Sequence, residues 1–175
     1  MDRRFGFIHD NLDIKILILF ILARLPEPVG GETLAQLTMI DDGINYFDFA
    51  ACLAELVRTG HATLEDNRYA ITDKGRTNGQ ITESGLPYSV RVQAEKNAAE
   101  VALHMRRSAL ISVSHTLRSR GGCTVSLSMS DGVTDVISMQ LLAGSEQQAQ
   151  QIEQRFQADA EKIYGDIMAL LTQEK

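Results

Sequence analysis

Lysine and arginine side chains in the first half of the chain offer the clearest chemistry in this sequence. Four of them fall in the stretch from Arg58 to Arg76, and two more stand near the N-terminus. Such side chains bind phosphate groups when a fold brings them onto one edge. The alternative, which the sequence leaves equally open, is that they are ordinary solvated charges. The six cations are Arg3, Arg4, Arg58, Arg68, Lys74 and Arg76.

Other reactive residue types form no pattern that supports catalysis or metal binding. The two cysteines, Cys52 and Cys123, are far apart, no CxxC pair exists, and the 4 histidines have no recognised ligand spacing. The sequence also lacks a glycine-rich phosphate loop, a nucleophile elbow and a His-Glu pair at metal-ligand spacing. We therefore expect no enzyme activity, no catalytic residues, no metal and no cofactor, with both thiols reduced and buried.

Composition limits the class of protein further. The 175 residues suffice for one domain or two small ones, and 44% of them are hydrophobic, which excludes a disordered chain. The net charge of −6 argues against a generally basic protein that coats nucleic acid, although a local basic patch remains open. The apolar run Ile16 to Ala23 is too short to span a bilayer and has no cleavage site after it. We expect a cytoplasmic protein without membrane contact.

The first half of the chain predicts three helices followed by a hairpin. The middle of the first helix is apolar on every side, whereas a surface helix has one apolar stripe. We therefore expect something beyond a small domain's own core to pack on it, and we expect a homodimer. Thr72 and Asp73 begin a further helical turn. The expected elements are helices at 11–25, 32–39 and 45–59, and strands at 61–65 and 68–72 around an Asp66-Asn67 turn.

The second half predicts a linker, a long helix, a hairpin and a last helix. Gly79 to Pro87 has the composition of a linker, so we expect domains at residues 1–80 and 81–175. From Tyr88 to Arg118 there is no glycine or proline, which favours one long helix. Alternation in Cys123 to Leu142, with Asp131-Gly132 as a two-residue turn, predicts a two-stranded hairpin. A final helix from Ser145 to Thr172 completes an α+β fold of helix–hairpin–helix type in this half.

The stretch "LVRTGHATLEDNRYAITDKG" resembles the winged-helix transcriptional regulators of the PadR and MarR kind. Their signature is a leucine-rich helix end, L-x-x-G, a hairpin, and Y-x-I/L-T-x-x-G. The resemblance covers Asn11 to Asn78. The whole chain, including "FIHDNLDIKILILFILARLPEPV" and "ITESGLPYSVR", is similar to a bacterial family catalogued only as a domain of unknown function.

The resemblance implies a homodimeric regulator of transcription that binds double-stranded DNA through an N-terminal winged helix-turn-helix. The C-terminal module would dimerise and sense an effector, either a small molecule or a protein. The role of the 123–142 hairpin is not implied. The residues expected at the DNA are Asn45, Asp48, Ala51, Cys52, Arg58, Arg68, Lys74 and Arg76.

Charge on the third helix favours a second hypothesis. Spacing at 100° per residue places Tyr46, Phe49, Ala50, Leu53, Leu56 and Val57 on its buried side. The same spacing exposes Ile44, Asp48, Ala51, Cys52, Glu55 and Thr59. Two carboxylates on a surface that faces the groove would repel phosphate. The alternative is therefore a winged-helix scaffold that binds a protein partner and not DNA.

Overall fold

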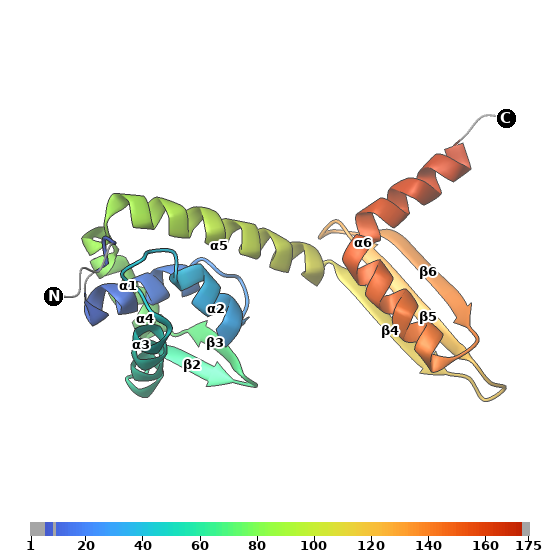
Figure 1. Ribbon diagram of the computed structural model, residues 1–175. Coiled ribbons are helices and arrows are strands. Elements are labelled where there is room, and N and C mark those ends of the chain that lie inside the picture. The colour runs from blue at the N-terminus through green and yellow to red at the C-terminus, as the bar shows by residue number, and fades with distance from the viewer. Residues whose placement is uncertain (1–5, 9, 173–175) are drawn as a thin grey trace. The chain divides into compact units, whose positions relative to one another are not determined.

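The computed structural model describes residues 6–8 and 10–172 of the chain (Figure 1). These residues form an α+β structure with six α-helices and two antiparallel sheets, each of three strands. The chain divides into two compact units, Met1–Met105 and Arg106–Lys175, which we describe separately as unit 1 and unit 2.

Unit 1 contains most of the helices and the smaller sheet. Its sheet has the strand order β1-β3-β2, so β3 is the central strand. The elements are α1 (Asn11–Leu22), β1 (Val29–Gly30), α2 (Gly31–Thr38), α3 (Tyr46–Arg58), β2 (Ala62–Glu65), β3 (Arg68–Ile71), α4 (Asp73–Thr82), the 3-10 helix η1 (Glu83–Gly85) and α5 (Tyr88–Ala109) up to Met105.

Helix α1 is the centre of unit 1. The side chain of Asp10 caps it by accepting a hydrogen bond of 2.8 Å from the backbone N–H of Asp13. Helices α2, α3 and α4, strand β3 and η1 all contact α1 and bury eight of its twelve residues. The packing from beyond the expected domain 1–80 comes from η1, so the helix is covered within its own unit. Its apolar circumference is explained by a central position, because each side meets a different element of the same unit.

The β2–β3 hairpin forms as the sequence predicts. Leu64 pairs with Tyr69, and the two residues of the turn, Asp66 and Asn67, both have positive φ angles, 47° and 60°. Two successive positive φ angles characterise a type I′ turn, whose twist matches that of the paired strands. Thr72 then caps α4, because its hydroxyl oxygen accepts a hydrogen bond of 3.0 Å from the N–H of Gly75.

The segment from Gly79 to Pro87 is not the linker that its composition predicts. Helix α4 continues to Thr82, η1 follows at once, and Leu86 is buried. Gly79 lies against Leu19 of α1, where α4 and α1 are in contact. Unit 1 extends past the expected boundary at residue 80, because α5 adds three apolar residues to its core: Val90, Ala94 and Ala102.

Unit 2 differs from the helix–hairpin–helix that we expected. The long helix ends at Ala109, and β4 (Ile111–Leu117) replaces its last part. Strand β4 pairs with β5 (Cys123–Ser130), which pairs with β6 (Asp135–Ala143), so the hairpin is a three-stranded sheet. The reason is visible in the order Ile111, Ser112, Val113, Ser114, where β-branched apolar residues alternate with polar ones and favour a strand over a helix.

The turn between β5 and β6 is longer than the two residues that Asp131-Gly132 predicts. The carboxylate of Asp131 accepts hydrogen bonds of 2.8 Å from the backbone N–H groups of both Val133 and Thr134. These bonds lower the pKa of Asp131, because they favour its charged form. Asp131 therefore organises a turn that continues to Thr134, and Val133 lies exposed in it.

The two faces of this sheet are chemically different. Helix α6 (Glu146–Thr172), which Ser145 precedes as expected, lies across one face of the sheet (Figure 1). Phe156 of this helix shares a core cluster with Val125 and Leu127 of β5. The other face carries many hydroxyl groups. For example, the register aligns Ser112, Ser128 and Ser138 across the three strands. The core of this unit comprises Cys123, Val125, Leu127, Met129, Ala143, Ala149, Phe156 and Ala160.

Candidate functional site

Helix α3 has well-defined ends that fix which residues face outward. The side-chain oxygen of Asn45 accepts a hydrogen bond of 2.9 Å from the backbone N–H of Asp48, and its amide donates one of 2.6 Å to the Asp48 carboxylate. Asn45 is thus the N-cap. At the other end Gly60, with a φ angle of 72°, stops the helix in the left-handed conformation that glycine adopts without strain.

The outer face of α3 is aromatic and small rather than acidic. Phe47, Ala51, Ala54 and Arg58 follow one another at helical spacing and are all exposed, Phe47 by 83%. We call these four residues the outer stripe of α3. The ring of Tyr46 stands beside it, 6.4 Å from the Phe47 ring centre in an edge-to-face arrangement. The outer stripe therefore offers apolar contact area and one cation.

The sequence-based orientation of α3 is wrong at three positions. Cys52 and Ile44 are buried, although the helical spacing placed both on the exposed side, and Tyr46 is exposed instead of buried. The burial of Cys52 agrees with the separate prediction that both thiols are buried. Cys52 lies one turn from both Phe49 and Leu56, so it belongs to the buried stripe. Its thiol donates to the backbone oxygen of Asn11 at 3.4 Å, and burial raises the pKa of this thiol. Cys52 is therefore not accessible as a contact residue.

The carboxylate of Glu55 on the flank of α3 forms ion pairs with two cations of its own unit. Lys15 of α1 lies 2.6 Å from one of its oxygens, and Arg58 lies 3.7 Å from the other. The hydrogen bond from Lys15, together with its positive charge, lowers the pKa of Glu55. The repulsion that we expected between this carboxylate and phosphate is therefore reduced by an adjacent cation.

Three of the predicted cations donate to backbone carbonyl groups. Lys74 donates to the oxygen of Thr59 at 2.7 Å and Arg76 to the oxygen of Ala23 at 3.2 Å. Thr59 and Ala23 are the C-caps of α3 and α1, so both cations satisfy carbonyls at the negative ends of helices. Arg68 of the hairpin donates to the oxygen of Pro28 at 3.4 Å. Each of these cations thus has a structural role besides any role at a ligand.

The eight predicted contact residues consequently do not form one patch. Ala51 and Arg58 lie on the outer stripe, and Asn45 and Asp48 lie at the start of α3. Lys74 is hydrogen-bonded to the C-terminal end of α3 and Arg76 to the C-terminal end of α1, whereas Arg68 lies on the hairpin. Arg3 and Arg4 lie outside the described residues.

A hydrogen-bonded chain around His61 was not predicted from the sequence. Its Nδ1 lies 2.8 Å from the Thr59 hydroxyl, and its Nε2 lies 2.8 Å from the side-chain nitrogen of Asn78. The Thr59 hydroxyl donates its proton to the backbone oxygen of Glu55, so the hydroxyl oxygen accepts a hydrogen bond from Nδ1–H of His61. Nε2 of His61 accepts a hydrogen bond from the Asn78 amide. This assigns a neutral imidazole. Burial, followed by the charge of Lys74, lowers the pKa of His61 and favours the same neutral form.

The hydrogen bonds of His61 connect three elements. Thr59 ends α3, His61 leads into β2, and Asn78 belongs to α4. Gly75 makes this possible, because a Cβ at that position would overlap the backbone oxygen of His61. In the sequence, Gly75 is the available signal for this close approach, and our prediction of a further helical turn after Thr72 does not use it.

The fold and this site define an α+β protein with two units, in which a three-helix core carries a β-hairpin. The chain belongs to the family described as "Domain of unknown function (DUF4364)", whose model matches residues 14–171. This confirms the similarity to an uncharacterised family. No curated protein and no solved structure matches the chain. Among the described helices, none has the length and apolar character needed to cross a membrane.

Proposed function

We propose that this protein is a winged-helix regulator of transcription that binds double-stranded DNA through α3. The order of α1, α2, α3 and the β2–β3 hairpin, with β1 as third strand, supports this class. In such proteins the third helix enters the major groove and the hairpin is the wing. The observation that carries the proposal is the outer stripe of α3, which is exposed along the helix and begins with Phe47, beside the exposed ring of Tyr46.

The outer stripe suits direct contact with bases. Ala51 and Ala54 leave the helix surface shallow, so the backbone can approach the groove closely. Alanine and phenylalanine make apolar contacts with the methyl group of thymine. Arg58 can reach phosphate or guanine from the last turn. The proposal therefore includes a preference for A·T-rich sites.

Non-specific affinity should be weak in this protein. The net charge is −6, and Lys74, Arg76 and Arg68 donate to carbonyl groups of their own chain. Because phosphate neutralisation supplies most non-specific affinity, the dependence on salt should be shallow, with a slope that corresponds to about two or three phosphate contacts.

A homodimer is part of this proposal, and unit 2 now supplies the argument for it. Beyond the backbone irregularity at Asp159, α6 ends with Met168, Leu170 and Leu171, which are exposed by 40%, 72% and 76%. Exposed apolar side chains that follow one another on a helix end are typical of an interface with a second copy. Helix α1 no longer supports dimerisation, because its own unit covers it.

One observation favours a second candidate, a scaffold that binds a protein partner. Tyr, Phe and Arg are enriched in protein interfaces. Phe47 and Arg58 begin and end the outer stripe, and Tyr46 lies beside it. Under this alternative, the same face would bind an apolar surface, and no duplex would bind at low salt.

The experiment is a fluorescence anisotropy titration of the full chain against A·T-rich and G·C-rich duplexes at two salt concentrations. Ala51→Glu places a carboxylate on the outer stripe, whereas Ala99→Glu, at an exposed alanine of α5 in the same unit, is the matched control. We expect Ala51→Glu to weaken binding about tenfold or more and Ala99→Glu to leave it within twofold. If the wild-type chain binds neither duplex at low salt, the DNA proposal fails. Equal losses in both variants would show that α3 is not the contact helix.

A further inference from the structure

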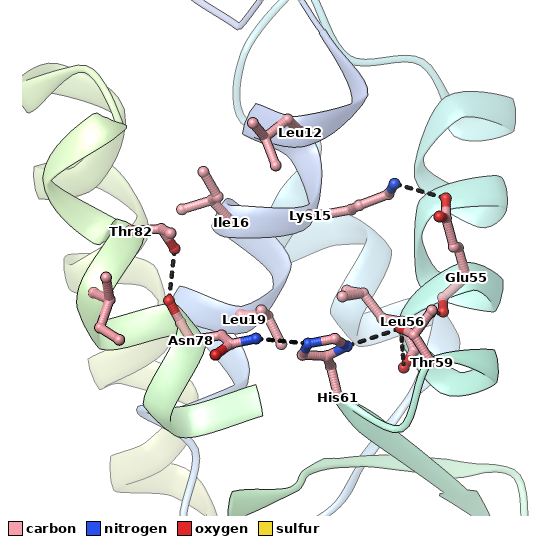
Figure 2. Close-up of a pocket in the computed structure, with 11 residues that line it drawn as sticks. Leu12, Lys15, Ile16, Leu19, Glu55, Leu56, Thr59, His61, Asn78 and Thr82 are labelled. Atoms are coloured by element: carbon pink, nitrogen blue, oxygen red, sulfur yellow. Dashed lines mark hydrogen bonds and ion pairs between the residues drawn. The ribbon is translucent and has the colours of Figure 1, made fainter. Parts of the chain in front are cut away.

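A cavity of about 310 Å³ opens between α1, α3 and α4 in unit 1 (Figure 2). This volume is at the lower end of the range for pockets that hold small molecules. Five apolar side chains provide most of its wall: Leu12, Ile16, Leu19, Leu56 and Ile81. Leu12 and Ile81 are exposed by 61% and 72%, so an occupant would cover apolar surface that otherwise meets water.

The polar groups around this cavity cancel one another's charge. Lys15 and Glu55, drawn together in Figure 2, form an ion pair at 2.6 Å. His61 is neutral, because its two ring nitrogens engage Thr59 and Asn78 in the pattern described above. A charged ligand would lose water without gaining an unpaired opposite charge, and that loss is costly.

The side chain of Asn78 has two groups left for hydrogen bonding within the described residues. Its amide donates one N–H to Nε2 of His61, and within the described residues the other N–H and the side-chain oxygen make no hydrogen bond. The hydroxyl of the neighbouring Thr82 donates to the backbone oxygen of Asn78 at 2.8 Å. The side chain of Asn78 can therefore donate to, or accept from, one group of a ligand.

We propose that this cavity is a binding site for a small uncharged molecule with an apolar body and one hydroxyl or carbonyl group. The apolar body packs on Ile16, Leu19 and Ile81, and the polar group bonds to the side chain of Asn78. This inference does not depend on DNA binding. It places an effector site in unit 1, whereas the resemblance implies a sensor in the C-terminal module.

The test uses benzyl alcohol as the probe and benzoate as a charged molecule of similar shape, each titrated into the full chain by NMR. Benzyl alcohol should bind with a Kd of about 1 mM, which is ordinary for so small a molecule. Benzoate should bind about tenfold more weakly. Benzoate binding as tightly as benzyl alcohol would overturn the argument from charge.

Two variants of α4 locate the binding site. Thr82→Phe should fill the cavity, whereas Thr77→Phe is its matched control, because Thr77 is also exposed and also donates to the carbonyl four residues earlier, at 2.9 Å. Thr82→Phe should lose binding at least tenfold, and Thr77→Phe should keep it within twofold. Retained binding in a folded Thr82→Phe variant would overturn the proposal.

A measurement on the wild-type chain keeps the test independent of these variants. Benzyl alcohol should shift the side-chain amide resonances of Asn78 and the methyl resonances of Ile16 and Ile81. The methyl resonances of Leu170 and Leu171, which are exposed on α6, should not shift. Shifts confined to α6, or no shifts at all at 10-fold excess over the expected Kd of about 1 mM, would overturn the proposal.

Discussion

Two glycines of α4 allow a sharp test of how this helix packs. At Gly75 a Cβ would overlap the backbone oxygen of His61 and lie 3.0 Å from Cγ1 of Ile71. At Gly79 it would lie 3.4 Å from the Cβ of Leu19, which is ordinary contact. Gly75→Ala should therefore destabilise unit 1, and Gly79→Ala should stabilise it slightly.

The expected magnitudes follow from the contacts. In Gly75→Ala the helix must move away from a backbone group, and overpacking of this kind costs about 1–3 kcal/mol. The move also lengthens the cap bond from Gly75 to Thr72, and loss of such a cap costs about 1 kcal/mol. We expect a loss of about 2–4 kcal/mol in the free energy of unfolding. Gly79→Ala should gain about 0.5–1 kcal/mol, because alanine favours a helix interior over glycine.

The assay is urea unfolding of the full chain followed by far-UV circular dichroism. With a slope of about 2 kcal/mol per molar urea, Gly75→Ala should lower the midpoint of unfolding by about 1–2 M. Gly79→Ala is the control for helix propensity, since it makes the same chemical change on the same helix. A Gly75→Ala variant as stable as the wild type would refute the close approach of α4 to His61.

Three further predictions concern other parts of the chain. The pKa of His61 lies below its ordinary value of 6.5, so the unfolded chain binds more protons there, and the free energy of unfolding should fall as the pH drops below about 6.5. In His61→Gln the difference between the unfolding midpoints at about pH 7.5 and 5.5 should be smaller than in the wild type. Proteinase K, which has broad specificity, should cleave first in the exposed segment 118–121 between β4 and β5, and not within residues 79–87, where Leu86 is buried. Mass spectrometry of the first fragments checks this. Leu170→Lys with Leu171→Lys should convert a dimer to a monomer in light scattering at micromolar concentration, whereas Val133→Lys, in the exposed β5–β6 turn, should not; a wild-type monomer would contradict the dimer.

The sequence predicts unit 1 well where local signals decide the structure. Asp10, Asn45 and Thr72 cap their helices as their residue types indicate, and Asp66-Asn67 forms the expected turn. These are interactions between residues a few positions apart, so a single sequence contains them. The same holds for α6, whose apolar spacing is regular.

The sequence fails where distant elements decide. Our prediction extends the long helix through Ile111 to Leu117 because this stretch lacks glycine and proline, although its apolar and polar residues alternate as in a strand. Pairing with β5, a distant segment, decides between the two. Gly79 begins a stretch with the composition of a linker, but it contacts Leu19, which lies sixty positions earlier in the chain. Similarly, the partners of His61 and Glu55, namely Asn78 and Lys15, come from other helices, so the cavity that they line has no local signature.

The central place of α1 has a consequence for how the protein is made. Its 12 residues precede every element that covers them, and the last of these, α4 and η1, ends only at Gly85. At a synthesis rate of about 5–20 residues per second, the ribosome adds the covering elements over roughly 3–12 s. During that interval the nascent chain presents an uncovered apolar segment, which is a binding site for chaperones and a starting point for aggregation. Slow translation of the region from α2 to η1 should therefore lower the yield of folded protein more than slow translation of unit 2.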